Sequence, residues 1–195
     1  MGVYGFNFGQ DTTIKKLALL LLGAIITGVT VSLFEEIIFR GALLQGLSKK
    51  VTPSLAIFAT SAVYAYVHFI SFTEPKIDET TNFFTIISQF YFTYSTSINI
   101  ENYDAFLSLF ILGLLLGLIR VRTKSILQCI AMHAGLVAGI KLFRFFMEYK
   151  PGTQFDFLVS NFDHRLGFMA MILLSIATTI YYFFYFKEKI PSKIH

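Results

Sequence analysis

The sequence predicts an all-α membrane protein, a polytopic bundle of about five to six transmembrane helices in a single domain over residues 1–195. Of its residues, 55% are hydrophobic and 14% are charged, whereas about 25% of the residues of a typical soluble domain are charged. The mean hydropathy is +0.65. The apolar residues also gather in uncharged runs, several of them close to the roughly 18 residues that indicate a membrane-spanning helix.

The first span is expected over Leu17–Phe34, which carries no charged residue. Its helical pattern continues through a charged motif as far as Leu47. As one straight helix, Leu17–Leu47 would be about 46 Å long, against a hydrocarbon core of about 30 Å. We therefore expect this segment to tilt, kink or divide, and three glycines are candidate points of breakage or close packing: Gly23, Gly28 and Gly41.

The second span is expected over Pro53–Phe72, because proline fits the first turn of a helix. The acidic connection that follows, Thr73–Asp104, contains apolar residues at helical spacing with polar residues between them. This pattern predicts an amphipathic helix that lies at the membrane interface. Such a helix could be a lid over a substrate groove, or it could simply cover the bundle.

The rest of the chain divides into two spans, a polar loop and a final span: Ala105–Ile119, Ser125–Ile140, Met147–Arg165 and Leu166–Phe186. Gly113 and Gly117 form a small-xxx-small pair, which permits close contact between helices. Tyrosines near the end of the final span indicate an aromatic belt at the membrane surface.

The net charge of +4 is spread over the ends of the apolar segments, with no dense basic tract and no nucleic-acid motif. We therefore expect a lipid bilayer, and no nucleic acid, as partner. If five spans alternate, the basic clusters fall on one side, which the positive-inside rule assigns to the cytoplasm: Lys49, Lys50, Arg120, Arg122, Lys124, Lys187, Lys189 and Lys193. The single cysteine, Cys129, excludes an intrachain disulfide.

Three charged residues, Glu35, Glu36 and Arg40, lie inside the first apolar segment. Each costs roughly 2.5–3.5 kcal/mol at the centre of a bilayer, so a functional site is the default interpretation. Glu36 and Arg40 are four apart on a helix and can pair. Glu35 points about 100° away from Glu36, and we predict that it is left to act as a general base. The alternative is that the three charges lie at a membrane edge.

Two histidines, His68 and His133, lie in other predicted spans. Ionisable groups in a membrane are least costly when they meet one another, which predicts that these histidines share a site with Glu35. Two chemistries are open. The three side chains could hold zinc or another divalent metal, or Glu35 and His68 could activate water while His133 donates to an oxyanion. The sequence does not decide between these two chemistries, so zinc or another divalent metal stays open as a cofactor. Cys129, four residues before His133, is expected to be a buried apolar residue.

The motifs resemble those of the CPBP family of intramembrane proteases, also called Abi or type II CAAX prenyl protease-like. That family has Glu-Glu-x-x-x-Arg, Phe-x-x-x-His and His-x-x-x-Asn in this order on separate helices. This chain has the first motif at Glu35–Arg40, the second at Tyr64–His68 and the third from His133, so the resemblance covers about residues 30–140. It implies a helical membrane endopeptidase in which Glu35 and His68 activate water and His133 stabilises the oxyanion. Glu36 and Arg40 would support the first helix.

Two residues depart from the family pattern. Tyr64 replaces phenylalanine, and Val137 stands where the family has asparagine. Valine cannot donate a hydrogen bond, and the loss of one oxyanion donor typically costs about 10²–10³ in rate. Either another donor compensates, or this member is slow or inactive.

The predicted function is hydrolysis of a peptide bond in a membrane-anchored protein or hydrophobic peptide, by a multi-pass protein of a prokaryotic cytoplasmic membrane. The alternative is a non-catalytic family member that binds a membrane peptide or confers immunity to a bacteriocin. A weaker alternative is a small transporter or channel whose buried charges line a path.

Overall fold

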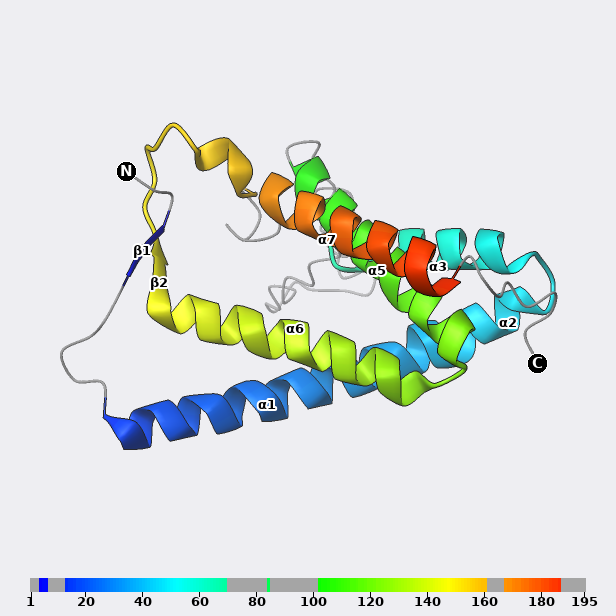
Figure 1. Ribbon diagram of the computed structural model, residues 1–195, viewed down its shortest axis with the longest axis horizontal. Helices are drawn as coiled ribbons and strands as arrows, with labels where there is room; N and C mark the ends of the chain where they lie inside the picture. Colours follow the sequence, from blue (N-terminus) through cyan, green and yellow to red (C-terminus); the bar gives the residue numbers. More distant parts are fainter. Residues whose placement is uncertain (1–3, 7–12, 70–83, 85–101, 161–166, 187–195) are drawn as a thin grey trace.

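The computed structural model describes residues 4–6, 13–69, 84, 102–160 and 167–186, and within them it is a helical bundle (Figure 1). Three helical segments are long and apolar enough to cross a membrane: Ile14–Ser48, Tyr103–Thr123 (α5) and Ile126–Phe146 (α6). Two shorter apolar helices accompany them, α3 over Pro53–Val67 and α7 over Phe168–Tyr181 followed by π-helix η4 over Tyr182–Phe186. The prediction of a multi-pass, all-α membrane protein is confirmed.

The first segment is continuous over 35 residues, but its winding changes after the charged motif begins. The α-helix α1 runs over Ile14–Glu36, the π-helix η1 over Ile37–Leu43, and α2 over Leu44–Ser48. No break occurs at Gly23 or Gly28, so glycine does not divide the segment there. The expected irregularity is instead a stretch of π-helix. Such stretches often occur at functional sites.

Close helix contacts form where glycines face a neighbour. Helices α1 and α6 lie side by side, and a Cβ built on Gly28 would come 2.6 Å from the Ala134 carbonyl oxygen (Figure 1). At the contact of α3 with α5, a Cβ on Gly113 would come 2.9 Å from the Ser61 Cβ. The small-xxx-small prediction is confirmed, because a side chain at these positions would push the backbones apart.

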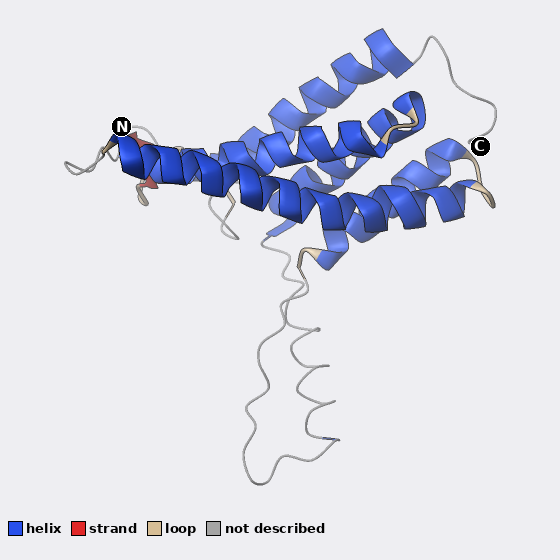
Figure 2. Ribbon diagram, turned by 90° about the horizontal axis from the view of Figure 1, so that it is seen from below, coloured by secondary structure: helices blue, strands red, loops and turns tan. Residues whose placement is uncertain are grey.

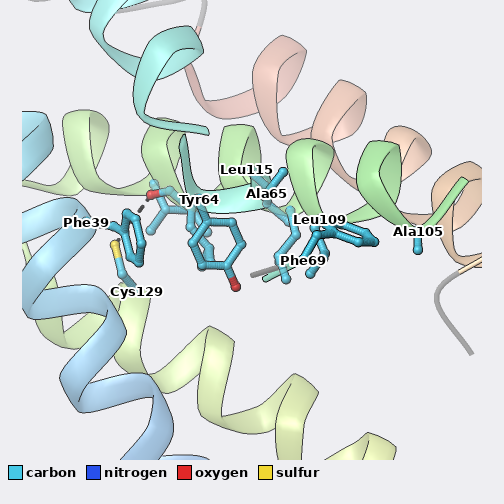
Figure 3. Close-up of a cluster of buried hydrophobic side chains, with 11 residues drawn as sticks. Phe39, Tyr64, Ala65, Phe69, Ala105, Leu109, Leu115 and Cys129 are labelled. Atoms are coloured by element: carbon cyan, nitrogen blue, oxygen red, sulfur yellow. Dashed lines mark hydrogen bonds between the residues drawn. The ribbon is translucent and has the colours of Figure 1, made fainter. Parts of the chain in front are cut away.

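Helix α5 supplies much of the core. Its residues form a buried cluster with residues from η1, from α6 and from α3 and the turn that follows it (Figure 3): Phe39, Tyr64, Ala65, Phe69, Ala105, Leu109, Leu112, Leu115, Leu116, Ile119 and Cys129. Helix α1 instead leaves many large apolar side chains exposed, such as Leu22 and Ile26. Exposed apolar side chains of this kind are expected on a surface that faces lipid tails.

Two short strands were not expected from the sequence. Strand β1 (Tyr4–Phe6) pairs antiparallel with β2 (Met147–Tyr149), at the end of the bundle where α1 begins and α6 ends (Figures 1 and 2). The prediction that Met147–Arg165 is entirely loop was therefore wrong. The pairing joins residues more than 140 positions apart, which short-range periodicity does not reveal.

Side-chain hydrogen bonds connect the segment after β2 to the helical bundle. The Ser160 hydroxyl donates to the buried Asp104 carboxylate, at 2.9 Å, and the Ser108 hydroxyl lies 3.2 Å from the Gly167 carbonyl oxygen. Farther out, the Thr153 hydroxyl donates to Asp156 and holds the pKa of that carboxyl below its usual value.

Helix boundaries differ modestly from those expected. Helix α3 ends at Val67 instead of Phe72, and α5 begins at Tyr103. The amphipathic helix predicted within Thr73–Asp104 lies outside the described residues, apart from Phe84 and the start of α5. The turn after α2 and the connection from α5 to α6 both lie at the end of the bundle opposite the strands (Figure 1).

Candidate active site

The structure brings Glu35, His68 and His133 together from three helices. Glu35 is the penultimate residue of α1, His68 caps the C-terminus of α3, and His133 lies in α6. The Glu35 Oε2 atom lies 3.7 Å from the His68 Nε2 and 3.8 Å from the His133 Nε2. One carboxylate oxygen therefore faces two imidazole nitrogens inside a helical bundle.

Glu36 and Arg40 form the buried ion pair that their spacing predicts. The Arg40 Nη1 donates to the Glu36 Oε1 at 3.1 Å, and the Arg40 Nη2 donates to the Gly113 carbonyl oxygen at 3.3 Å. Arg40 also lies over the Tyr64 ring, with its Cζ 4.5 Å from the ring centroid. The pair thus joins the first segment to α5 and α3, because the arginine contacts both.

A hydrogen bond between Glu36 and His133 was not predicted. The His133 Nδ1 lies 2.9 Å from the Glu36 Oε1. Glu36 is fully buried, and its Oε1 also accepts a hydrogen bond from Arg40. This carboxylate therefore contacts both the arginine of its own helical segment and a histidine of the candidate site. The two residues are 97 positions apart, and no sequence spacing indicates such a contact.

The hydrogen bonds of the two histidines define which ring nitrogen faces Glu35. The His68 Nδ1 lies 2.7 Å from the Tyr64 carbonyl oxygen. A carbonyl oxygen can only accept, so the Nδ1 donates and the neutral ring presents an unprotonated Nε2. His133 is oriented in the same sense because its Nδ1 donates to the Glu36 carboxylate. Both Nε2 atoms therefore face Glu35 as acceptors when the rings are neutral.

The Glu35 Oε2 atom is buried and has no hydrogen-bond partner among the described residues. The side chain as a whole is 26% exposed, and that of His68 is 28% exposed. A buried acceptor without a partner is unfavourable, and two further acceptors face it here. A water molecule, which has two donors, has the chemistry to satisfy such a set of groups.

Two other residues singled out in the sequence play no direct part in this geometry. The Cys129 thiol donates to the Leu116 carbonyl oxygen at 3.5 Å and packs in the buried apolar cluster, which agrees with its expected role. Val137 lies one turn after His133 on α6 and is half-buried.

A metal site was one of the two chemistries left open. Two imidazoles and one carboxylate are donors that zinc accepts. In the described part of the chain, however, no three such side chains are grouped so that they could hold a metal ion.

The comparisons with known proteins bear on the family. No curated protein and no solved structure matches this chain. A family model described as type II CAAX prenyl endopeptidase Rce1-like matches residues 17–138, which is more than half of the chain and includes Glu35, His68 and His133. The chain therefore belongs to the Rce1-like family of type II CAAX prenyl endopeptidases, which are membrane proteases.

Proposed function

We propose that this protein is an intramembrane endopeptidase in which Glu35 and His68 activate a water molecule and His133 stabilises the oxyanion. The observation that carries the proposal is the position of the Glu35 Oε2 within 3.8 Å of both imidazole Nε2 atoms. A general base must lie within hydrogen-bond reach of the proton that it takes, directly or through one water. The Glu35 carboxylate and the His68 Nε2 provide that arrangement for a water molecule, and the His133 Nε2 lies beside them.

In the proposed step, the water oxygen forms a bond to the peptide carbonyl carbon while one water proton passes to Glu35. The His68 Nε2 accepts a hydrogen bond from the other proton and orients the water. The electron pair of the carbonyl π bond moves to the oxygen. When the C–N bond breaks, the leaving nitrogen takes the proton from Glu35, and the products are a carboxylic acid and an amine.

His133 can donate from its Nε2 to the oxyanion when both of its ring nitrogens carry protons. Glu36 fixes the orientation of the ring, because its carboxylate lies 2.9 Å from the His133 Nδ1 and is itself paired with Arg40. Charge-assisted hydrogen bonds of this kind are roughly twice as strong as neutral ones. The supporting pair therefore acts on the site through His133.

The test is cleavage of a fluorogenic membrane peptide by the purified protein in proteoliposomes. We expect Glu35→Gln to lower kcat/KM by roughly 10²–10⁴-fold, the range of a general base, and His68→Ala and His133→Ala also to lose activity. Glu35→Gln keeps the size of the side chain, so a loss of activity reports on the charge. If all three variants, well folded, cleave at the wild-type rate, the assigned roles are wrong.

Metal dependence is tested in the same assay by exhaustive chelation. The proposed mechanism needs no metal, so we expect full activity after dialysis against chelators. Loss of activity that zinc alone restores would assign Glu35, His68 and His133 as a two-His, one-Glu metal site instead.

The proposed substrate is a membrane-anchored protein or hydrophobic peptide, and the proposed location is a prokaryotic cytoplasmic membrane. A second candidate function follows from Val137, which supplies no donor where the family pattern has asparagine. It is a non-catalytic member that binds a membrane peptide or confers immunity to a bacteriocin. In that case Glu35→Gln leaves the cellular phenotype intact, whereas a protease loses it.

A further inference from the structure

Tyr64 lies among the residues of the candidate active site and is almost fully buried, with 1% of its surface exposed. Its ring centroid is 4.6 Å from that of His68, 6.3 Å from that of His133 and 5.1 Å from that of Phe39. Phe39 and the Arg40 guanidinium pack against the same ring. The orientation of Tyr64 is therefore restricted by its neighbours.

The hydroxyl of Tyr64 is directed out of the apolar cluster. Figure 3 shows that the ring lies in the apolar cluster while its hydroxyl points away from α5, to the side where α1 and α6 pass. On that side the Glu35 carboxylate lies close enough to act electrostatically on the hydroxyl. A buried hydroxyl without a hydrogen-bond partner is unfavourable, and a carboxylate oxygen is an acceptor that would satisfy it.

The Tyr64 hydroxyl also differs in kind from the other groups that face Glu35. The two imidazoles approach Glu35 through Nε2 atoms, and their Nδ1 atoms already donate elsewhere. In neutral form, both rings therefore offer acceptors. The phenolic O–H group is a hydrogen-bond donor and can donate a hydrogen bond to a carboxylate oxygen.

We propose that Tyr64 is a positioning residue for Glu35: its hydroxyl donates to the carboxylate and so keeps the Oε2 directed at the imidazoles of His68 and His133. The inference rests on the proposed function of Glu35 as the base. It assigns to the hydroxyl a role that a phenylalanine ring, equally able to fill the space, cannot perform. This chain thus has a donor at Tyr64 while Val137 supplies none.

The first test is steady-state cleavage by Tyr64→Phe, which removes only the hydroxyl. Hydrogen bonds to charged groups are strong enough that we expect kcat to fall about 10- to 100-fold, with KM within about twofold because substrate binding is not altered. Tyr103→Phe is the matched control: Tyr103 is 52% exposed at the start of α5, and this variant should keep wild-type kcat. An unchanged kcat in Tyr64→Phe, or a change in KM alone, overturns the proposal.

A second readout does not depend on activity. The infrared band of the Glu35 carboxylate is identified by its loss in Glu35→Gln, and it should shift in Tyr64→Phe but not in Tyr103→Phe. If the band shifts and no variant or wild-type protein cleaves a peptide, the protease proposal fails while the contact stands. If the wild type cleaves and the band does not move, the positioning role of Tyr64 fails.

Discussion

Two adjacent glutamates, Glu35 and Glu36, have different environments because successive helix residues point about 100° apart. Glu36 is fully buried and accepts from both Arg40 and His133. Glu35 is 26% exposed and faces two imidazole nitrogens at 3.7–3.8 Å. Only Glu36 lies at hydrogen-bonding distance from the Arg40 cation. Substitutions of the two carboxylates should therefore have different effects.

The first prediction at this scale concerns Glu36→Gln. The substitution keeps the shape of the side chain but leaves the buried Arg40 without its counter-ion, a change that typically costs about 3–5 kcal/mol. We expect a marked loss of thermal stability together with a loss of activity. Cys129, the single and buried cysteine, allows unfolding to be followed with a thiol-reactive dye in detergent.

The control for that prediction is Glu35→Gln, which should melt close to the wild type because its side chain is partly exposed and has no cation beside it. If the two variants have equal melting temperatures, the division between a supporting and a reacting glutamate is not correct.

At the scale of elements, contacts between helices depend on residues that lack a side chain. Gly28 lies against the α6 backbone, and Gly113 and Gly117 lie against Ser61 and Ile57 of α3. In a bilayer, helices associate by close van der Waals packing because lipid tails are as apolar as leucine. The position of His133 beside Glu36 follows from this close approach of α6 to α1.

Gly28→Ala should therefore destabilise the α1–α6 contact. The added Cβ would lie 2.6 Å from the Ala134 carbonyl oxygen, a backbone atom that can move only with its helix. We expect a loss of about 1–3 kcal/mol, which lowers the melting temperature by roughly 2–4 °C for each kcal/mol, and a fall in activity as the helices separate.

Gly23→Ala is the matched substitution on the same helix. A Cβ at Gly23 meets nothing within 4 Å, and alanine favours a helix by about 1 kcal/mol over glycine. This variant should be as stable as the wild type or more so. Equal destabilisation by both substitutions would show that the contact at Gly28 is not the cause.

At the scale of the whole molecule, basic residues lie at both ends of the bundle. Lys49, Lys50 and Lys124 lie at the end where α2 and α5 finish, and Lys15, Lys16 and Lys150 lie at the other end, near β1 and β2 (Figure 1). The orientation expected from the sequence places Lys49, Lys50 and Lys124 in the cytoplasm. The third basic cluster of that prediction, Lys187, Lys189 and Lys193, lies outside the described residues.

Single cysteines placed at Lys49, Lys124 and Lys150 in a Cys129→Ala background test this orientation with an impermeant maleimide. All three lysines are exposed. We expect Lys49→Cys and Lys124→Cys to react in inverted vesicles and Lys150→Cys to react in right-side-out vesicles. If Lys49→Cys and Lys124→Cys react from opposite sides, the bundle does not cross the membrane as described.

Contacts that depend on spacing within one helix could be predicted from the sequence. The pairing of Glu36 with Arg40 was predicted, because it depends only on a spacing of four within one helix. The close packing at Gly113 and Gly117 was predicted for the same reason. The π-helix over Ile37–Leu43 and the strand pair were missed, since one is a change of winding and the other a contact between distant segments.

The sequence by itself determined that this is a helical membrane protein and which ionisable residues it carries inside its apolar segments, because hydrophobicity and helical periodicity are local properties. The tertiary structure alone decided that the Glu35 Oε2 faces both imidazoles, that Glu36 holds His133 and that the Tyr64 ring packs beside His68. Those contacts join residues from three helices, and they depend on how the helices cross and which rotamers their packing allows.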